Sequence, residues 1–192
     1  MNSDNLAYKY DEICDELING EIVMMTPRPV VNHNIVAFNI AKTFSDHLKG
    51  KSCMSFGDGV DLYLNDKNRF VPDGMIVCDR SKIKADGVHG APDLVIEVLS
   101  PSTAKNDRGK KKDAYEKAGA GEYWIVNTVD KSIEVYLLES GKYVLDNVYS
   151  IYPDYILKKM NDEERAAVET ELKCSLFDDL TIKLEDIFAN MF

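Results

Sequence analysis

The stretch PDLVIEVLS, from Pro92 to Ser100, is the most informative part of this 192-residue sequence. Apolar side chains occupy positions 94–96, 98 and 99, so both faces of the segment are apolar. A strand of this kind is typical of the centre of a sheet that is covered on each side. We therefore predict a buried central strand, in which Glu97 is an unexpected charge.

The neighbouring segments alternate between the sequence patterns of strands and helices. Predicted strands occupy residues 20–25, 60–64, 70–79 and 122–127, and residues 131–138 and 141–148 are predicted to pair as a hairpin. Apolar residues recur every four positions from Val36 to Leu48 and predict a helix over 32–48. Residues 107–118 are predicted to form a polar helix that Gly119 ends. This order predicts an α/β fold, a mixed β-sheet flanked by helices.

The length of the chain suits a single domain over residues 1–192. We expect its core to cover about residues 12–150, and residues 151–192 to form an acidic C-terminal extension. Near the N-terminus, residues 10–19 are predicted to be a short helix or loop, followed by a turn at Asn19 and Gly20. In the extension, residues 161–173 are predicted to be helical, and a closing segment near the end is expected to pack on the core.

Charge and composition limit the partners that we expect. The net charge of −10 opposes a phosphate-binding surface, but the acidic excess lies in the first 27 and last 32 residues, and the centre is near neutral. The apolar runs are too short to span a membrane, and the first residues lack a secretory signal, so we expect a cytoplasmic protein. The four cysteines stand far apart without a C-x-x-C pair, and we expect them to remain thiols.

Two carboxylates stand out in apolar surroundings. Glu97 interrupts the most apolar strand, where an unpaired carboxylate is energetically costly. Asp73, between Pro72 and Gly74, interrupts the strand predicted over residues 70–79. A salt bridge or an early exit to solvent would also account for Glu97, and an ordinary edge bulge would account for Asp73.

Three consecutive lysines occur in the predicted helix of residues 107–118. Lys111 has Tyr115 four residues later and therefore lies on the face most suited to packing against the sheet. Lys112 and Glu116 have the same spacing and are predicted to form a solvated ion pair. Lys110 and Lys112 remain alternatives to Lys111, and the whole run is also compatible with a solvated helix face.

Together, Asp73, Glu97 and Lys111 suit one kind of chemistry. Two carboxylates from neighbouring strands can bind Mg²⁺ or Mn²⁺, which prefer oxygen ligands and leave room for water and phosphate. Such a metal lowers the pKa of a bound water, and a lysine can stabilise the charge that develops during phosphodiester hydrolysis. Zinc is not expected, because the three histidines are scattered along the chain.

Six stretches form a recognisable combination: NGEIVMM (19–25), the helix that begins at His33, VPDGMIV (71–77), APDLVIEVLSPST (91–103), DRGKKKDAYEKAG (107–119) and EYWIVN (122–127). This combination resembles the Uma-two family, in the restriction-endonuclease-like PD-(D/E)XK superfamily. The resemblance covers roughly residues 12–150. It implies an endonuclease that hydrolyses DNA phosphodiester bonds with Mg²⁺ or Mn²⁺ held by Asp73 and Glu97.

The resemblance also bears on the lysine and on a further acid. The superfamily usually places a lysine two residues after the second acid, but that position is Leu99 here. The pattern therefore points to a lysine on the following helix, Lys111. Glu21 matches an acid that is common in the family's first strand and is a possible additional site acid, although a solvated strand residue would fit the position equally well.

A second interpretation is that the protein has the nuclease fold but no catalytic activity. A nuclease-fold protein without activity would act as a binding or regulatory module, because a fold does not establish turnover. A homodimer is a further expectation by analogy, since cleavage of both strands of a duplex needs two sites. The nuclease would be favoured by a basic rim around the two carboxylates, formed by Lys105, Arg108, Lys110 and Arg80.

Overall fold

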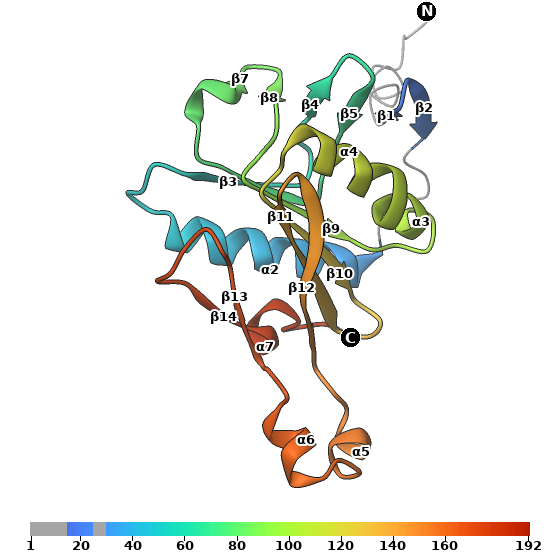
Figure 1. Cartoon of the computed structure of the whole chain (residues 1–192), viewed down its shortest axis with the longest axis vertical. Coiled ribbons are helices and arrows are strands. Elements are labelled where there is room, and N and C mark those ends of the chain that lie inside the picture. The colour runs from blue at the N-terminus through green and yellow to red at the C-terminus, as the bar shows by residue number, and fades with distance from the viewer. Residues whose placement is uncertain (1–14, 25–29) are drawn as a thin grey trace, which may run out of the picture.

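A computed structural model of the chain describes residues 15–24 and 30–192. Its central element is a six-stranded sheet with the strand order β12-β11-β10-β9-β6-β3 (Figure 1). β9 and β10 pair in parallel, and the other neighbours pair antiparallel, so the sheet is mixed, as predicted. The strands are β3 (Met54–Gly57), β6 (Gly74–Val77), β9 (Leu94–Val98), β10 (Glu122–Asn127), β11 (Ser132–Glu139) and β12 (Lys142–Ser150).

The connection between β9 and β10 is a helix with an irregular middle. It consists of α3 (Ala104–Asn106), a π-helical segment η3 (Asp107–Lys111) and α4 (Lys112–Ala118). Gly119 ends it with a φ of 89°, the left-handed conformation that glycine adopts at helix ends, as predicted. Parallel neighbours need such a crossover connection, and this one packs α4 against one face of the central sheet.

A second six-stranded sheet, with the order β2-β1-β5-β4-β8-β7, packs in the same core as α4. A short 3₁₀ turn, η2 (Arg80–Lys82), precedes β7. The strand predicted over residues 60–64 belongs to this second sheet, which the sequence patterns did not separate from the first. Its strands are β1 (Asp15–Ile18), β2 (Glu21–Met24), β4 (Leu62–Asn65), β5 (Asn68–Phe70), β7 (Ile83–Lys84) and β8 (Gly87–His89).

Strand β1 shows that the prediction of a helix or loop was wrong for residues 15–18, while residues 10–14 lie outside the described residues. Asn19 and Gly20 have φ values of 53° and 85° and turn the chain into an antiparallel hairpin with β2. Two consecutive residues with positive φ form the tight turn that matches the twist of a hairpin. The predicted turn is therefore correct, and it explains why a strand precedes it.

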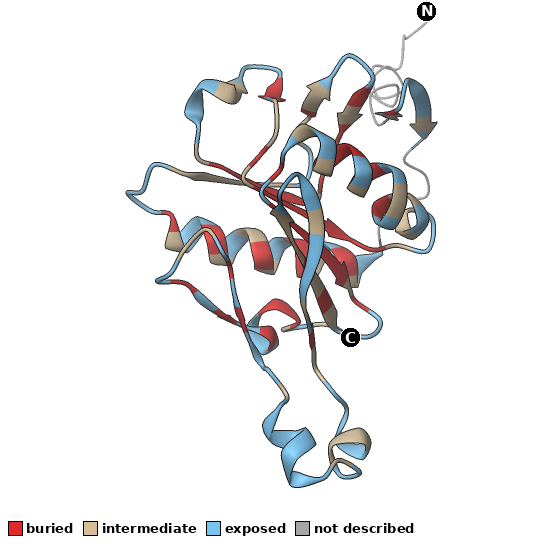
Figure 2. Cartoon of the chain, viewed as in Figure 1, coloured by how far each residue is buried: buried red, intermediate tan, exposed pale blue. Residues whose placement is uncertain are grey.

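Two apolar cores lie on opposite faces of the central sheet, whose middle strands β6, β9 and β10 are the buried ones in Figure 2. Along β9, positions 94, 96 and 98 belong to one core, and positions 95 and 99 belong to the other. Helix α2 (Val31–His47) covers the first core with the apolar stripe that predicted it. Because side chains alternate across a strand, Glu97 points toward the second core, where α4 and the second sheet pack.

The C-terminal part contains α5 (Asp154–Leu157), α6 (Asp162–Ala166), β13 (Glu171–Lys173), β14 (Thr181–Lys183) and α7 (Leu184–Ile187). Helices α5 and α6 extend away from the central sheet (Figure 1), whereas the segment from β13 to α7 packs in the α2 core. The helix predicted over residues 161–173 is too long. It ends at Ala166, and Leu172 is buried within a strand instead.

Two observations bear on the expectations about thiols and membranes. Cys53 and Cys78 form a disulfide, so the expectation that all four cysteines remain thiols is wrong in this structure. The register explains the contact, because the pairing of Met54 with Val77 across β3 and β6 continues outward to Cys53 and Cys78. Among the described helices, none is long and apolar enough to cross a membrane.

Candidate active site

Glu97, in β9, lies in the second core and is 3% exposed. Its Oε1 atom lies 2.6 Å from the Nζ atom of Lys111 and accepts a hydrogen bond of 2.6 Å from the hydroxyl group of Tyr115. A salt bridge, which would by itself account for a carboxylate in this strand, is thus present. Its partner is the same lysine that the sequence pattern predicted for the site.

Asp73 immediately precedes β6 and lies opposite Glu97. The register pairs Gly74 with Ile96, so the next pair outward is Asp73 with Glu97. Directly opposed residues on antiparallel strands point to the same face, with Cβ atoms about 4.5–5.5 Å apart. The Oδ2 atom of Asp73 accepts a hydrogen bond of 2.7 Å from the N–H group of Val98, which fixes one carboxylate beside the other.

Lys111 is the last residue of the π-helical segment and is 4% exposed. A π-turn inserts an extra residue into a helical turn, changes the direction of the side chains that follow, and is frequent at functional sites. The carbonyl oxygen of Asp107, at the start of this segment, accepts a hydrogen bond of 2.9 Å from the hydroxyl group of Tyr123. Tyr123 therefore supports the irregular backbone from which Lys111 reaches Glu97.

Glu16, in β1, joins this cluster, although the sequence patterns did not predict it. Its side chain is buried, and its Oε1 atom lies 3.0 Å from the Nζ atom of Lys111. The same oxygen accepts a hydrogen bond of 3.0 Å from the N–H group of Val71, two residues before Asp73. Glu16 thus links β1 to the lysine and to the segment that carries Asp73. Its alternation with Ile18 before the tight turn was the available sequence signal of a strand with a buried face.

The other candidates from the sequence lie outside this cluster. The side chain of Glu21 is 72% exposed, and its Oε2 atom lies 3.2 Å from the Nζ atom of Lys110. The predicted ion pair between Lys112 and Glu116 is wrong, because Glu116 pairs with Lys142 of β12 at 2.7 Å. Of the three consecutive lysines, Lys111 is the one that the structure brings into contact with Glu97.

His33, in the first turn of α2, contacts Asp73 and is buried. Its Nε2 atom lies 3.3 Å from the Oδ1 atom of Asp73. Burial alone would lower the pKa of His33, but the hydrogen bond and the charge of Asp73 raise it above its ordinary value. In the sequence, His33 marked only the beginning of a helix. The structure places it in contact with a predicted site residue.

Asp107 is a further buried carboxyl group near Lys111. Its Oδ1 atom lies 3.7 Å from the Nζ atom of the lysine, and its side chain is 1% exposed. Burial raises the pKa of Asp107 above its ordinary value, an effect that Lys111 partly offsets. Like Glu16, this acid occurs in a polar stretch of sequence, where nothing indicates that it becomes buried.

The cluster contains more carboxyl groups than cations. Burial raises the pKa of Glu97 well above its ordinary value; Lys111 opposes this effect, and the charges of Asp107, Asp73 and Glu16 add to it. Burial alone would lower the pKa of Lys111, but Glu97, Glu16 and Asp107 raise it above its ordinary value, so the lysine stays charged. One ammonium group cannot balance four nearby carboxylates, and this imbalance favours the uptake of protons or of another cation.

Asp73 and Glu97 fit a divalent cation in the chemistry of their donors. Their oxygens are the hard ligands that Mg²⁺ and Mn²⁺ prefer, and they belong to directly opposed residues. Within residues 15–24 and 30–192, no three or more His, Cys, Asp or Glu side chains are grouped so that they could hold a metal ion. The described protein groups would therefore supply two carboxylates. Mg²⁺ is often bound in this way, with water and phosphate completing its coordination.

The surface near the cluster is of mixed charge. Arg108 and Lys110, expected in a basic rim, are paired with Glu134 at 2.7 Å and with Glu21 at 3.2 Å. Lys105 is exposed on the same crossover helix. The expectation for the fourth member, Arg80, is wrong: it lies beyond the opposite end of β6 from Asp73 and donates a hydrogen bond of 2.8 Å to the carbonyl oxygen of residue 52. The expected rim is thus partly neutralised by neighbouring acids.

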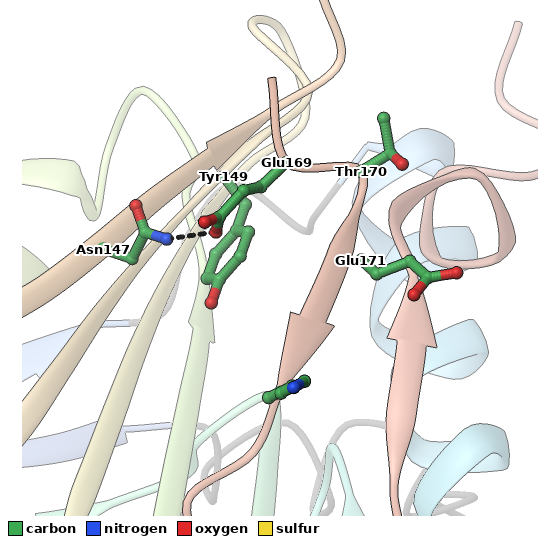
Figure 3. A pocket seen from close by; sticks show the side chains of 6 residues that line it. Asn147, Tyr149, Glu169, Thr170 and Glu171 are labelled. Atoms are coloured by element: carbon green, nitrogen blue, oxygen red, sulfur yellow. Dashed lines mark hydrogen bonds between the residues drawn. The ribbon is translucent and has the colours of Figure 1, made fainter. Parts of the chain in front are cut away.

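Two surface hollows are lined by described residues. One, of about 470 Å³, lies beside β12 and β13, and Figure 3 shows the hydrogen bond from Asn147 to Glu169 at its edge. The other, of about 800 Å³, is lined mainly by the second sheet and includes Glu16, which contacts Lys111. Neither is lined by Asp73, Glu97 or Lys111. The candidate site is a buried charge cluster. Of its four described carboxylates, Asp73 is the most accessible, with 12% of its side chain exposed; the others are Glu16, Glu97 and Asp107.

The mixed sheet flanked by helices is the architecture expected from the sequence patterns. A solved structure from Anabaena variabilis, described as a putative nuclease, is similar with a TM-score of 0.67. The similarity covers 91% of this chain and 89% of that chain at 19% sequence identity. The predicted fold class is therefore confirmed.

The chain belongs to the Uma2 (Uma-two) family, described as "putative restriction endonuclease", whose family model matches residues 6–166. An uncharacterized protein of Synechocystis sp. (strain PCC 6803) is 31% identical over 107 residues. That match covers 55% of this chain and 56% of the relative, so it spans little more than half of either protein. The resemblance inferred from the motifs is confirmed, and the family description supports a nuclease.

Proposed function

We propose that this protein is an endonuclease that uses Mg²⁺ or Mn²⁺ to hydrolyse DNA phosphodiester bonds in the cytoplasm. The observation that carries the proposal is the opposition of Asp73 and Glu97, with the Nζ atom of Lys111 2.6 Å from Glu97. When bound by these carboxylates, the metal would lower the pKa of a water molecule and polarise the phosphate. The family description supports nuclease activity in general terms.

The protein's own groups have distinct roles in this proposal. Asp73, the more exposed of the two carboxylates, is the one that incoming ligands reach first. Lys111 supplies a positive charge that stabilises the negative charge developing on the phosphate. Its ammonium group is buried and held by Glu16, and such preorganised charges are the effective ones in catalysis. Tyr115 donates to Glu97 and orients that carboxylate.

DNA is the proposed partner, and the charge of the protein shapes how it would bind. A net charge of −10 does not attract a polyanion at long range. The attraction would have to come from the local basic residues and from the divalent cation between protein and phosphate. We also propose a homodimer for cleavage of both strands, because the described part of each chain carries one cluster of this kind.

Cleavage of supercoiled plasmid DNA with Mg²⁺ or Mn²⁺ tests the proposal. The wild type should cleave, and Asp73→Asn should reduce the rate by about 100-fold or more, a typical effect of removing one group that stabilises the transition state. Asp154→Asn is the matched control, because Asp154 also follows a proline but is exposed in α5. An unchanged rate in Asp73→Asn would remove this residue from the mechanism. A wild type that binds metal and DNA without cleaving would instead be a binding module.

A further inference from the structure

Asp107 is a buried carboxyl group to which the proposed reaction gives no role. Its side chain is 1% exposed, and neither of its oxygens reaches hydrogen-bond geometry with a donor of the described residues. Thr103 and Lys111 lie near enough to favour its ionised form, but burial opposes them. Buried polar groups are nearly always paired, because an unpaired one is costly. An acid kept in this state requires an explanation.

The position of Asp107 indicates a partner for it. Asp107 and Lys111 are the first and last residues of η3, and the Oδ1–Nζ distance of 3.7 Å is about 1 Å longer than a charge-assisted hydrogen bond. In this structure the ammonium group contacts Glu97 at 2.6 Å and Glu16 at 3.0 Å instead. The Nζ atom therefore lies about 1 Å too far from Asp107 for a close contact while it is held by Glu97.

We propose that Asp107 is a positioning residue that accepts the ammonium group of Lys111 when Glu97 binds a divalent cation, an inference that rests on the proposed function. A divalent cation on Glu97 would lie near the ammonium group of Lys111, and the repulsion between the two positive charges weakens the contact of Lys111 with Glu97. Asp107 holds the lysine after the exchange. Lys111 therefore stays beside the reacting phosphate, and Asp107, whose oxygens make no hydrogen bond in the cation-free protein, gains a close partner.

If Lys111 moves from Glu97 to Asp107, the affinity for the cation depends on Asp107. A purely structural role for Asp107 would not produce this dependence. In the cation-free protein, Asp107→Asn removes a buried acid that makes no hydrogen bond and only a long contact with Lys111, so the stability should stay the same or rise. In the cation-bound protein, the same change removes the carboxylate that receives Lys111, so cation affinity should fall. A residue that merely supports the fold would show the opposite pattern, with lower stability and unchanged affinity.

The test measures Mn²⁺ binding by titration calorimetry and thermal unfolding with and without Mn²⁺, on the full chain. Asp107→Asn should raise the Kd for Mn²⁺ by about fivefold or more, the lower end of typical coupling between sites. Its cation-free Tm should equal or exceed that of the wild type, and the Tm increase on adding Mn²⁺ should be smaller. Asp113→Asn, an exposed acid in the first turn of α4, is the matched control and should behave as the wild type.

Each remaining outcome has a definite meaning. An unchanged Kd in Asp107→Asn, or a variant that does not fold without the cation, would overturn the inference and leave the proposed function intact. Asp107→Glu keeps the charge and should bind Mn²⁺ more tightly than Asp107→Asn; equal weakening in both variants would also overturn it. A wild type that binds no Mn²⁺, alone or with a phosphorothioate duplex, would overturn the proposed function and this inference together.

Discussion

Lys111 is the residue on which the other members of the cluster depend. Replacing it by Ala leaves two buried acids without their cation, and we expect a loss of about 3–5 kcal/mol in the free energy of unfolding. The cleavage rate, measured where the variant is still folded, should fall by orders of magnitude more than in Lys112→Ala. Lys112 lies over the ring of Tyr136, 3.3 Å from its centroid, and away from the two carboxylates. Equal rates in the two variants would mean that the catalytic lysine is not Lys111.

Glu16 and Glu21 lie in one hairpin and allow a second comparison of residues. Glu16→Gln weakens the hold on Lys111 and on the N–H group of Val71, so we expect a loss of about 1–3 kcal/mol in unfolding free energy. Glu21→Gln changes an exposed acid and should leave stability within about 0.5 kcal/mol of the wild type. Urea unfolding measures both. A larger loss in Glu21→Gln would contradict the placement of β1.

Sequence patterns identify some of these residues and not others, for physical reasons. Asp73 and Glu97 were predicted because each interrupts an apolar strand, where a charge is conspicuous. Glu16 and Asp107 stand among other polar residues, and their burial arises from contacts with segments far along the chain. The spacing of Lys111 and Tyr115 placed the lysine correctly toward the sheet, although it contained no information about the π-turn that carries this lysine.

Among the elements, β10 holds the C-terminal segment to the central sheet through Glu122. This carboxyl group is fully buried and accepts hydrogen bonds of 2.6 Å from the indole of Trp124 and of 2.5 Å from the hydroxyl group of Ser175. The N–H group of Ser175 donates a further hydrogen bond of 3.0 Å. Glu122 therefore connects the loop after β13 to the strand that pairs with β9.

The titration of Glu122 gives a pH-dependent prediction. Burial raises its pKa above 4.5, so the folded protein keeps this proton at pH values where the unfolded chain has released it. Its contribution to stability is therefore greatest below pH 4.5 and decreases as the pH rises through the raised pKa. Relative to Glu122→Gln, the wild type should lose unfolding free energy as the pH rises from 4.5 through the raised pKa of Glu122.

Urea unfolding across this pH range provides the measurement. Glu171→Gln, a change of an exposed acid in β13, should show no such slope relative to the wild type. A wild type that gains stability over Glu122→Gln as the pH rises would show that its three donors stabilise the ionised form more than burial opposes it.

Some helices and strands could be predicted from the sequence patterns, and others could not. Helix α2 and strands β9 and β10 have strong apolar periodicity, and the structure agrees with each prediction closely. The second sheet was missed because its strands are short and pair across long stretches of chain, as β1 does with β5. The helix predicted over residues 161–173 was too long, because the burial of Leu172 in β13 outweighs local helix propensity.

For the whole molecule, the proposed homodimer leads to a prediction about the products of plasmid cleavage. A monomer carries one cluster and cuts one strand at a time, so nicked plasmid should accumulate before linear DNA at low protein concentration. If two copies act together, linear DNA should appear without a nicked intermediate as the concentration rises. Light scattering at the same concentrations shows whether a dimer has formed. Direct linearisation by a protein that remains monomeric would contradict the proposal of a dimer.

The central claim is that Asp73 and Glu97 form a divalent-cation site, and Mn²⁺ titration calorimetry on the wild type, Asp73→Asn and Asp154→Asn tests it most directly. We expect the wild type and Asp154→Asn to bind with the same Kd, and Asp73→Asn to show no measurable binding. Equal binding by all three proteins would contradict the claim, because the cation would then be held by residues other than the carboxylates that β6 and β9 bring together.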